Sequence, residues 1–151
     1  MYKATVRAII RRGIRRLNAG DPDFLMKLAH PSAEICFPGD NSWATMFRPV
    51  EKGRRVHVTH SGLDECRAFA DRFVGEGIEF GIEDILVNGP PWRTRVALRA
   101  YDFQPDGHGG DEYNNRAVAF LELRWGKLIR WEDYEDTERV AAWDSRRAAT
   151  A

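Results

Sequence analysis

The residues best suited to chemistry lie in the stretch 127–136, which reads KLIRWEDYED. Trp131 and Asp133 are two residues apart, so on a β-strand both side chains point to the same face. A carboxylate beside an indole suits the wall of an apolar pocket, where burial raises the carboxyl pKa toward the working pH. Asp133 is therefore our candidate general acid or base, with Trp131 as a substrate-binding wall. The alternative is a surface strand whose acidic residues are solvated.

Four further side chains could take part in such chemistry. In one pocket with Asp133, Glu34 would keep one of the two carboxyls protonated and allow a proton relay; alternatively, it pairs with an arginine at the sheet edge. Arg99 could hold a substrate oxygen or orient Asp133, or it could form a cross-strand ion pair. Tyr101 and Asn115 are candidate hydrogen-bond donors to a carbonyl or epoxide oxygen.

The cysteines and histidines give weaker signals. Cys36 shares a strand face with Glu34, and His60 precedes a predicted helix, where it could line a lid or lie on the surface. Cys36 and Cys66 are far apart, and His57 and His60 have no carboxylate at a recognised ligand spacing. We therefore expect no metal and no cofactor, and two reduced, buried thiols in a cytoplasmic protein.

Three helices and a short strand are predicted in the first half of the chain. Apolar residues at helical spacing predict a first helix over residues 3–19, with arginines on its other side. Asp21 caps a short second helix that ends near Leu28, and Ser61, with Asp64 in the capping-box position, starts a third that ends at Gly75. A strand is predicted over residues 33–37.

The remaining segments comprise a long loop and four strands. Residues 40–60 have no sustained period, which is typical of a lid or binding loop, although 55–59 could form a hairpin. Turn residues then separate four predicted strands, which cover residues 78–87, 92–103, 112–125 and 128–137. The tail after residue 137 is charged, with Val140 and Trp143 as its only expected anchors.

This order of elements is an α+β pattern within one domain of 151 residues. A curved sheet that closes over helices leaves a cone with an apolar mouth, which is a common ligand site. Lysine plus arginine equals aspartate plus glutamate, 23 each, which argues against a nucleic-acid binder. No apolar run approaches the roughly 18 residues of a membrane span, and the first residues lack a signal-peptide core, so no membrane partner is expected.

The element order and the final motifs resemble the NTF2-like superfamily, and within it the SnoaL-like and limonene epoxide hydrolase-like enzymes. Tyr113 and Asn114, followed by residues 131–136, resemble the Tyr-Asn and Trp-Arg-Asp-Tyr-Phe-Asp of those hydrolases, and residues 61–65 resemble the SnoaL-like start of the third helix. The resemblance implies a cone of three N-terminal helices on a curved, mostly antiparallel sheet.

For function, the resemblance implies a cofactor-free enzyme that acts on a small apolar molecule by acid/base chemistry, as a hydrolase, isomerase or cyclase. The alternative is a non-catalytic ligand-binding or assembly module, because the superfamily also contains proteins that only bind. It further implies a homodimer through the outer face of the sheet, where Val118 and Phe120 would otherwise form an exposed apolar patch.

The catalytic pattern of the epoxide hydrolases is incomplete in this chain. Their last-strand aspartate corresponds to Asp133, and their Arg-x-Asp on the preceding strand gives either Arg99 with Tyr101 or, shifted by one, Ala100 with Asp102. Arg99 and Asp102 are three residues apart, so only a β-bulge would turn both into the pocket.

The water-holding residues of those enzymes are also replaced. Their Tyr-x-Asn on the first strand falls on Glu34 and Cys36. This replacement also weakens the prediction of a strict epoxide hydrolase.

Overall fold

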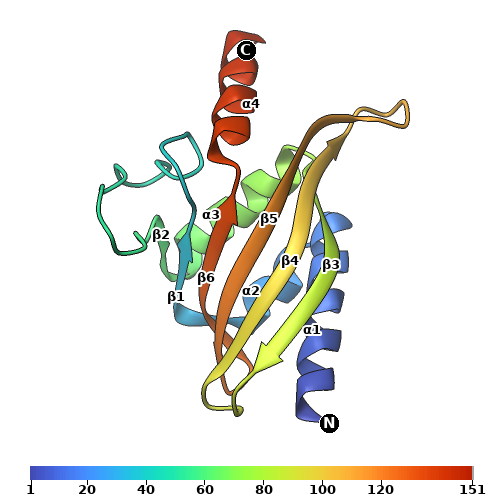
Figure 1. The fold of residues 1–151 in the computed structure, drawn as a ribbon, viewed down its shortest axis with the longest axis vertical. Coiled ribbons are helices and arrows are strands. Elements are labelled where there is room, and N and C mark those ends of the chain that lie inside the picture. The colour runs from blue at the N-terminus through green and yellow to red at the C-terminus, as the bar shows by residue number, and fades with distance from the viewer. Residues whose placement is uncertain (151) are drawn as a thin grey trace.

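The computed structural model describes residues 1–150, which form one curved sheet and four helices (Figure 1). The helices are α1 (Tyr2–Asn18), α2 (Asp23–Leu28), α3 (Gly62–Gly75) and α4 (Thr137–Thr150). The strands are β1 (Ala29–Cys36), β2 (His60–Ser61), β3 (Glu79–Asn88), β4 (Thr94–Pro105), β5 (Asp111–Arg124) and β6 (Lys127–Glu135).

The six strands lie in the order β2-β1-β6-β5-β4-β3. Only β1 and β6 pair in parallel, and every other pair is antiparallel. The predicted α+β architecture with a curved, mostly antiparallel sheet is confirmed, including the antiparallel meander after Gly77. Along β4 and β5 buried and exposed residues alternate, so one face of the sheet carries the core and the other faces outward.

The first helix covers the inner face of β3 (Figure 1). Val6, Ile14 and Leu17 are buried, as their helical spacing predicted. Asn18 fixes the end of the helix, because its amide both donates to and accepts from the backbone of Phe80, at 2.8 and 2.9 Å. α1 therefore lies on the concave side of the sheet and forms part of the wall of the cone.

The segment around β1 differs most from the sequence-based prediction. β1 begins four residues before the predicted strand, at Ala29. The predicted hairpin at residues 55–59 is wrong; instead, the Thr59 backbone N–H donates to Ile35, and β2 pairs with β1. The helix cap also differs, because the Ser61 backbone N–H donates to Glu65, at 2.6 Å, rather than to Asp64.

The charged tail after residue 137 forms helix α4, which the sequence did not predict. Val140 and Trp143 are both buried, so the two predicted anchors are confirmed. Val140 and Trp143 are three residues apart, and a single pair of apolar residues does not establish the helical period over the 14 residues of α4. Because α4 packs against other elements rather than standing free, tertiary contacts explain why it is ordered.

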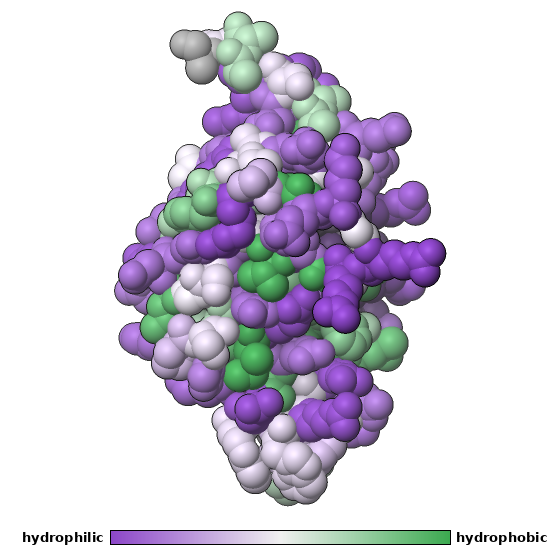
Figure 2. Space-filling model, turned by 90° about the vertical axis from the view of Figure 1, so that its left-hand side faces the viewer, coloured by the Kyte–Doolittle hydropathy of each residue, from purple (hydrophilic) through white to green (hydrophobic). Residues whose placement is uncertain are grey.

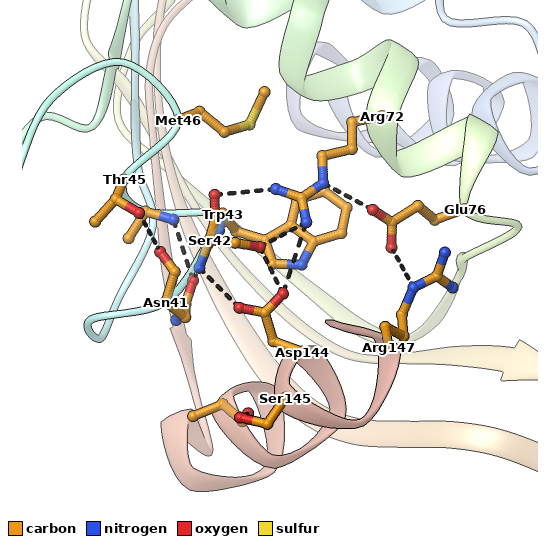
Figure 3. A network of polar contacts seen from close by, with 12 residues as sticks. Asn41, Ser42, Trp43, Thr45, Met46, Arg72, Glu76, Asp144, Ser145 and Arg147 are labelled. Carbon is orange, nitrogen blue, oxygen red and sulfur yellow. Dashed lines mark hydrogen bonds and ion pairs between the residues drawn. The ribbon is translucent and has the colours of Figure 1, made fainter. Parts of the chain in front are cut away.

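A polar network centred on Arg72 connects α3, α4 and the loop of residues 37–59 (Figure 3). The guanidinium donates to the Ser42 backbone oxygen and hydroxyl, at 3.0 and 2.6 Å, and to Glu76 at 2.7 Å. It also stacks 3.9 Å from the centre of the Trp43 ring. Asp144 of α4 accepts two hydrogen bonds from Ser42, so the loop lies between the two helices and contacts both.

The two cysteines are both free and buried, as predicted. Burial raises the pKa of the Cys36 thiol to about 12 and that of Cys66 to about 11. Both thiols therefore stay protonated and unreactive at neutral pH. Within residues 1–150, no helix is both long and apolar enough to cross a membrane.

We expect Arg72→Met to lower the free energy of unfolding by about 2 kcal/mol, because several partly buried hydrogen bonds to a charged group are lost. Arg67→Met is the matched control on the same helix. Arg67 pairs with Asp23 and Asp71 on the surface, at 2.7 and 2.8 Å, so its replacement should lower the stability much less than that of Arg72. Urea unfolding of the three proteins measures the difference, and equal losses would contradict the role of Arg72.

Candidate functional site

A cavity of about 100 Å³ lies between the concave face of the sheet and the helices. Aromatic rings dominate its apolar wall; they belong to Phe37, Trp43, Phe69, Phe73, Phe80 and Trp143. Trp43 from the loop stacks on Trp143 from α4, with ring centres 6.3 Å apart. The loop and α4 thus both contribute to closing the cavity, and the Arg72 network holds them together (Figure 3).

Four titratable side chains enter this apolar space from adjacent strands. They are Asp102 on β4, Tyr113 on β5, and Asp133 and Glu135 on β6. Opposite Asp133 and Glu135, strand β5 carries the small residues Ala119 and Ala117. Because the alanine side chains are small, they leave space on the inner face for the neighbouring carboxyl groups. Larger residues at the two alanine positions would fill that space.

Asp133 and Trp131 line the cavity side by side, as their two-residue spacing predicted. The indole N–H of Trp131 donates to Asp133 Oδ1 at 2.7 Å, which leaves Oδ2 for a proton or a ligand. Asp133 is only 8% exposed, and burial raises its pKa to about 7. A carboxyl with this pKa is partly ionised at neutral pH and can both accept and return a proton.

Glu135 is the carboxyl group in the cavity that most favours the protonated form. Burial, together with the nearby Asp102 and Asp133, raises its pKa to about 9. Its Oε2 accepts a hydrogen bond from Asn115 at 3.1 Å, whereas its buried Oε1 has no hydrogen-bond partner within residues 1–150. At neutral pH Glu135 is therefore a carboxylic acid, which can donate a hydrogen bond.

Asp102 and Tyr113 complete the polar side of the cavity. Burial raises the pKa of Asp102 to about 6, and its Oδ1 has no hydrogen-bond partner among the described residues. Burial, with Asp102 and Glu135 nearby, raises the pKa of Tyr113 well above its usual value. The Tyr113 hydroxyl accepts from Asn115 at 3.1 Å and is also within hydrogen-bonding reach of Asp102.

Two predicted site residues on β4 lie outside the cavity. Arg99 is exposed, and its Nε lies 3.1 Å from Glu83 on the neighbouring strand, so the ion-pair alternative applies. Tyr101 is 41% exposed and packs beside Phe103 on the outer face. The pairing of β4 with β5 has no bulge between Arg99 and Asp102, so only Asp102 faces inward.

Of Glu34 and Cys36, which were expected to face the cavity with Asp133, only Glu34 is a lining residue. Glu34 borders the cavity, but its carboxylate accepts from Arg130 Nη1 at 2.6 Å. The parallel register explains this placement, because Ile35 lies opposite Trp131, whereas Glu34 and Cys36 lie opposite Arg130 and Glu132. Residues in register share a face, so Ile35 is the residue that points into the cone with Trp131.

His60 and Asn115 have positioning roles rather than direct access to the cavity. His60 is fully buried, with its ring 4.8 Å from Phe69 and its Nδ1 2.8 Å from the Thr59 hydroxyl. Burial lowers its pKa to about 4, so it is neutral at physiological pH. The Asn115 amide is occupied by Tyr113, Glu135 and the Asp136 backbone, so it orients the two cavity groups.

Sequence reasoning missed the roles of Glu135 and Tyr113 and left Asp102 as an alternative to Arg99. A signal was present, because Trp131, Asp133 and Glu135 follow the two-residue period of one strand face. Tyr113 and Asn115 share the same period on β5.

No group of three or more potential metal ligands is placed to hold a metal ion within residues 1–150. The arrangement as it stands can move protons through its own carboxyl groups.

The sequence matches one known protein family, and the fold is similar to several solved structures. A family model for the SnoaL-like domain matches residues 10–131. No curated protein matches the chain.

Among solved structures, Bal32a from a soil-derived mobile gene cassette has a TM-score of 0.64 at 19% identity, with 92% of this chain and 95% of that chain covered. A loop-truncated variant of IdmH gives 0.67 at 17% identity, with 91% and 98% covered. A Jannaschia sp. CCS1 protein, named after SnoaL-like polyketide cyclases, gives 0.63 at 16% identity, with 94% and 92% covered. At these identities the likenesses show a shared fold.

We expect the melting temperature to fall by several degrees between pH 6.5 and 9. The folded-state pKa values of Asp133 and Glu135, about 7 and about 9, exceed their ordinary values, so the folded state holds protons that the unfolded state has lost. That stabilisation is complete at low pH and disappears as the pH rises through each folded pKa. His60, whose pKa is lowered from 6.5, acts in the opposite direction only below this window.

Glu135→Gln should largely flatten this pH dependence, because Glu135 accounts for most of the titration between pH 6.5 and 9 and the amide does not titrate. Asp71→Asn, at an exposed position on α3, should show the same fall of melting temperature with rising pH as the wild type. Calorimetric melts across the pH series measure both. A wild-type melting temperature that stays constant from pH 6.5 to 9 would contradict the raised pKa values.

Proposed function

Since the chain belongs to the SnoaL-like family of the NTF2-like superfamily, we propose that it is a cofactor-independent acid/base enzyme acting on a small, mostly apolar molecule. The family match agrees with the resemblance found in the motifs around Tyr113 and Trp131. The cavity is the substrate site in this proposal, because it is enclosed, mostly apolar and supplied with a few convergent polar groups.

The observation that carries the proposal is the environment of Asp133. Its carboxyl group is buried, held by the Trp131 indole N–H, and has a pKa of about 7. General acid/base catalysis works best when the pKa of the catalytic group is near the working pH. Asp133 is therefore the group that takes a proton from the substrate and returns it.

Glu135 and Tyr113 supply the complementary acid in this mechanism. Both stay protonated at neutral pH, and the buried Glu135 Oε1 lacks a partner among the described residues. A neutral carboxylic acid and a phenol in an apolar site can donate hydrogen bonds to a carbonyl oxygen as negative charge develops on it. The groups thus suit removal of a proton from the carbon next to a carbonyl.

This chemistry favours an isomerase or cyclase over an epoxide hydrolase. Arg99 points away from the cavity and pairs with Glu83, so it is absent from the place where an Arg-x-Asp pair would act on an epoxide. The similar Jannaschia protein that is named after polyketide cyclases adds support for proton transfer beside a carbonyl.

The size of the cavity restricts the substrate. An apolar cavity of roughly 150 Å³ holds benzene, so a space of about 100 Å³ admits a smaller molecule. A larger substrate would require the walls of the cavity to move apart.

The second candidate function is ligand binding without catalysis. The observation in its favour is the incomplete Arg-x-Asp pattern, in which Tyr101 and Arg99 both lie on the outer face. The two candidates differ in whether a bound ketone exchanges its protons.

We expect wild-type protein in D₂O to exchange the α-protons of small ketones such as acetone, as followed by NMR. Asp133→Asn should slow this exchange on the order of 10²- to 10⁴-fold, because the amide cannot accept a proton. The Trp131 hydrogen bond can be kept by the amide oxygen, so the melting temperature should hold or rise. Glu83→Gln on the outer face should exchange like the wild type.

The outcomes distinguish the two functions. Ketone binding, seen as a thermal shift, without exchange in any of the proteins would favour the non-catalytic module. A sharply lower melting temperature for Asp133→Asn would identify Asp133 as a structural residue instead.

We also propose a cytoplasmic homodimer that forms through the outer face of the sheet. Both thiols are free and buried, which suits a reducing compartment. Val118 and Tyr134 lie opposite each other on β5 and β6 and are 42% and 49% exposed, whereas Phe120 is half-buried. Covering these apolar side chains with a second copy of the chain would stabilise a dimer.

Val118→Asp should therefore convert the dimer to a monomer, because the new charge would be buried at the centre of the contact. Val56→Asp is the control, since Val56 is similarly exposed, at 43%, but lies on the loop. Sedimentation velocity at micromolar concentration measures the mass. A monomeric wild type would contradict the dimer.

A further inference from the structure

Two tryptophans are exposed together at one end of the molecule, which we call the apex. The apex comprises the turn between β3 and β4, residues 89–93, and the turn between β5 and β6, residues 125–126. Trp92 and Trp125 are 58% and 69% exposed, and their ring centres are 5.9 Å apart. The Trp125 backbone N–H donates to the Pro91 oxygen at 2.7 Å, so the two turns form one unit.

The apex projects from the end of the sheet opposite the C-terminal end of α4 (Figure 1). In the space-filling view, this lower end is a pale, weakly polar protrusion below a surface of strongly polar side chains (Figure 2). The shape is convex, so the apex offers a surface for contact rather than a pocket.

The backbone at Trp125 is strained. Within residues 1–150 it is the only residue other than glycine with a positive φ, 52°, and Gly126 follows at 78°. Arg124 and Lys127 pair across this two-residue turn, where the preferred residues are asparagine or aspartate followed by glycine. A bulky residue that is exposed and strained costs stability without core packing in return, which points to a function for its side chain.

Basic residues surround the tryptophans. Arg93, Arg124 and Lys127 are all exposed at the apex. The Tyr2 hydroxyl bonds to the Thr94 hydroxyl, so the first turn of α1, with exposed Lys3, lies beside them. Glu122, the acidic residue nearest along β5, already pairs with Arg95.

This local charge contrasts with the balance of the whole chain. The chain has a formal net charge of zero, yet residues 1–19, which include α1, and residues 85–101 and 123–131, which include the two apex turns and the adjoining parts of the strands, contain no aspartate or glutamate. The three segments together give this end of the molecule a positive surface.

We propose that the apex docks on the surface of an anionic lipid bilayer, with Trp92 and Trp125 in the interfacial region and the basic residues on the headgroups. Tryptophan rings favour this interface, and each basic residue near it adds attraction to anionic lipid. This contact is peripheral and needs no membrane-spanning segment.

Two observations favour a bilayer over a nucleic acid or a protein. The tryptophan rings are tilted by 44°, so they offer no parallel gap in which a base could stack on both. The convex apex suits a soft, flat surface, whereas a protein partner would have to supply a matching pocket. The proposal is independent of the catalytic one, because no cavity residue lies in the apex.

Flotation of the full chain with vesicles tests the proposal. We expect binding to vesicles of phosphatidylcholine with phosphatidylglycerol and little binding to phosphatidylcholine alone. Added salt should weaken binding, because it screens the headgroup attraction. Brominated lipids should quench the fluorescence of bound protein, since Trp92 and Trp125 would then contact the acyl boundary.

Trp125→Asn separates function from folding. Asparagine followed by Gly126 is the preferred sequence for this turn, so the variant should melt at a higher temperature yet lose vesicle binding. Arg93→Gln should weaken binding roughly fivefold. Phe47→Ser, which removes an aromatic ring that is 43% exposed on the loop, is the control and should bind like the wild type.

Three outcomes would overturn the proposal. They are an absence of binding to anionic vesicles, unchanged binding by a folded Trp125→Asn variant, and tighter binding of the wild type to a fluorescent oligonucleotide than to vesicles. The last would instead assign the positive surface to nucleic acid.

Discussion

Side chains on β4 and β5 alternate between the two faces of the sheet, and both the core and the candidate site depend on this alternation. On the inner face the sheet carries the apolar core from Val96 to Ala100 and also the carboxyl groups of Asp102 and Asp133. The same alternation sends Arg99 outward to Glu83. Burial raises the pKa values of the carboxyl groups in the cavity, and no basic side chain among the described lining residues opposes this rise.

Burial of three carboxyl groups in an apolar space opposes folding whenever they ionise. The structure limits this cost by hydrogen bonds from Trp131 to Asp133 and from Asn115 to Glu135. It also leaves one oxygen each on Asp102 and Glu135 without a partner among the described residues. Such unsatisfied groups are rare in folded proteins and typically occur where function requires them. The cavity and the strained Trp125 are thus two separate places where local stability is reduced.

The aromatic wall of the cavity depends on elements that are distant in the sequence. Trp43 and Trp143 stack on each other, and beside them Arg72 and Asp144 both bind Ser42. The loop, α3 and α4 are therefore joined at the aromatic wall, whereas β4 and β6 supply the carboxyl groups.

Local pattern in the sequence determined the α+β order of elements, the meander and the inward position of Trp131 with Asp133. These features follow from periods of two and 3.6 residues, which a sequence displays directly. The carboxyl at position 135 carried the same period, although nothing nearby in the sequence indicated that it would be buried.

Tertiary structure alone decided the register of β1, the order of α4 and the protonation of the cavity. A shift of one residue in the pairing of β1 with β6 exchanges the faces of Glu34 and Ile35, and no local signal specifies that register. Helix α4 is ordered by Trp43 and the Arg72 network rather than by its own sequence. The pKa values of Asp133 and Glu135 depend on burial and on Asp102 from another strand, so they exist only once the cone has closed.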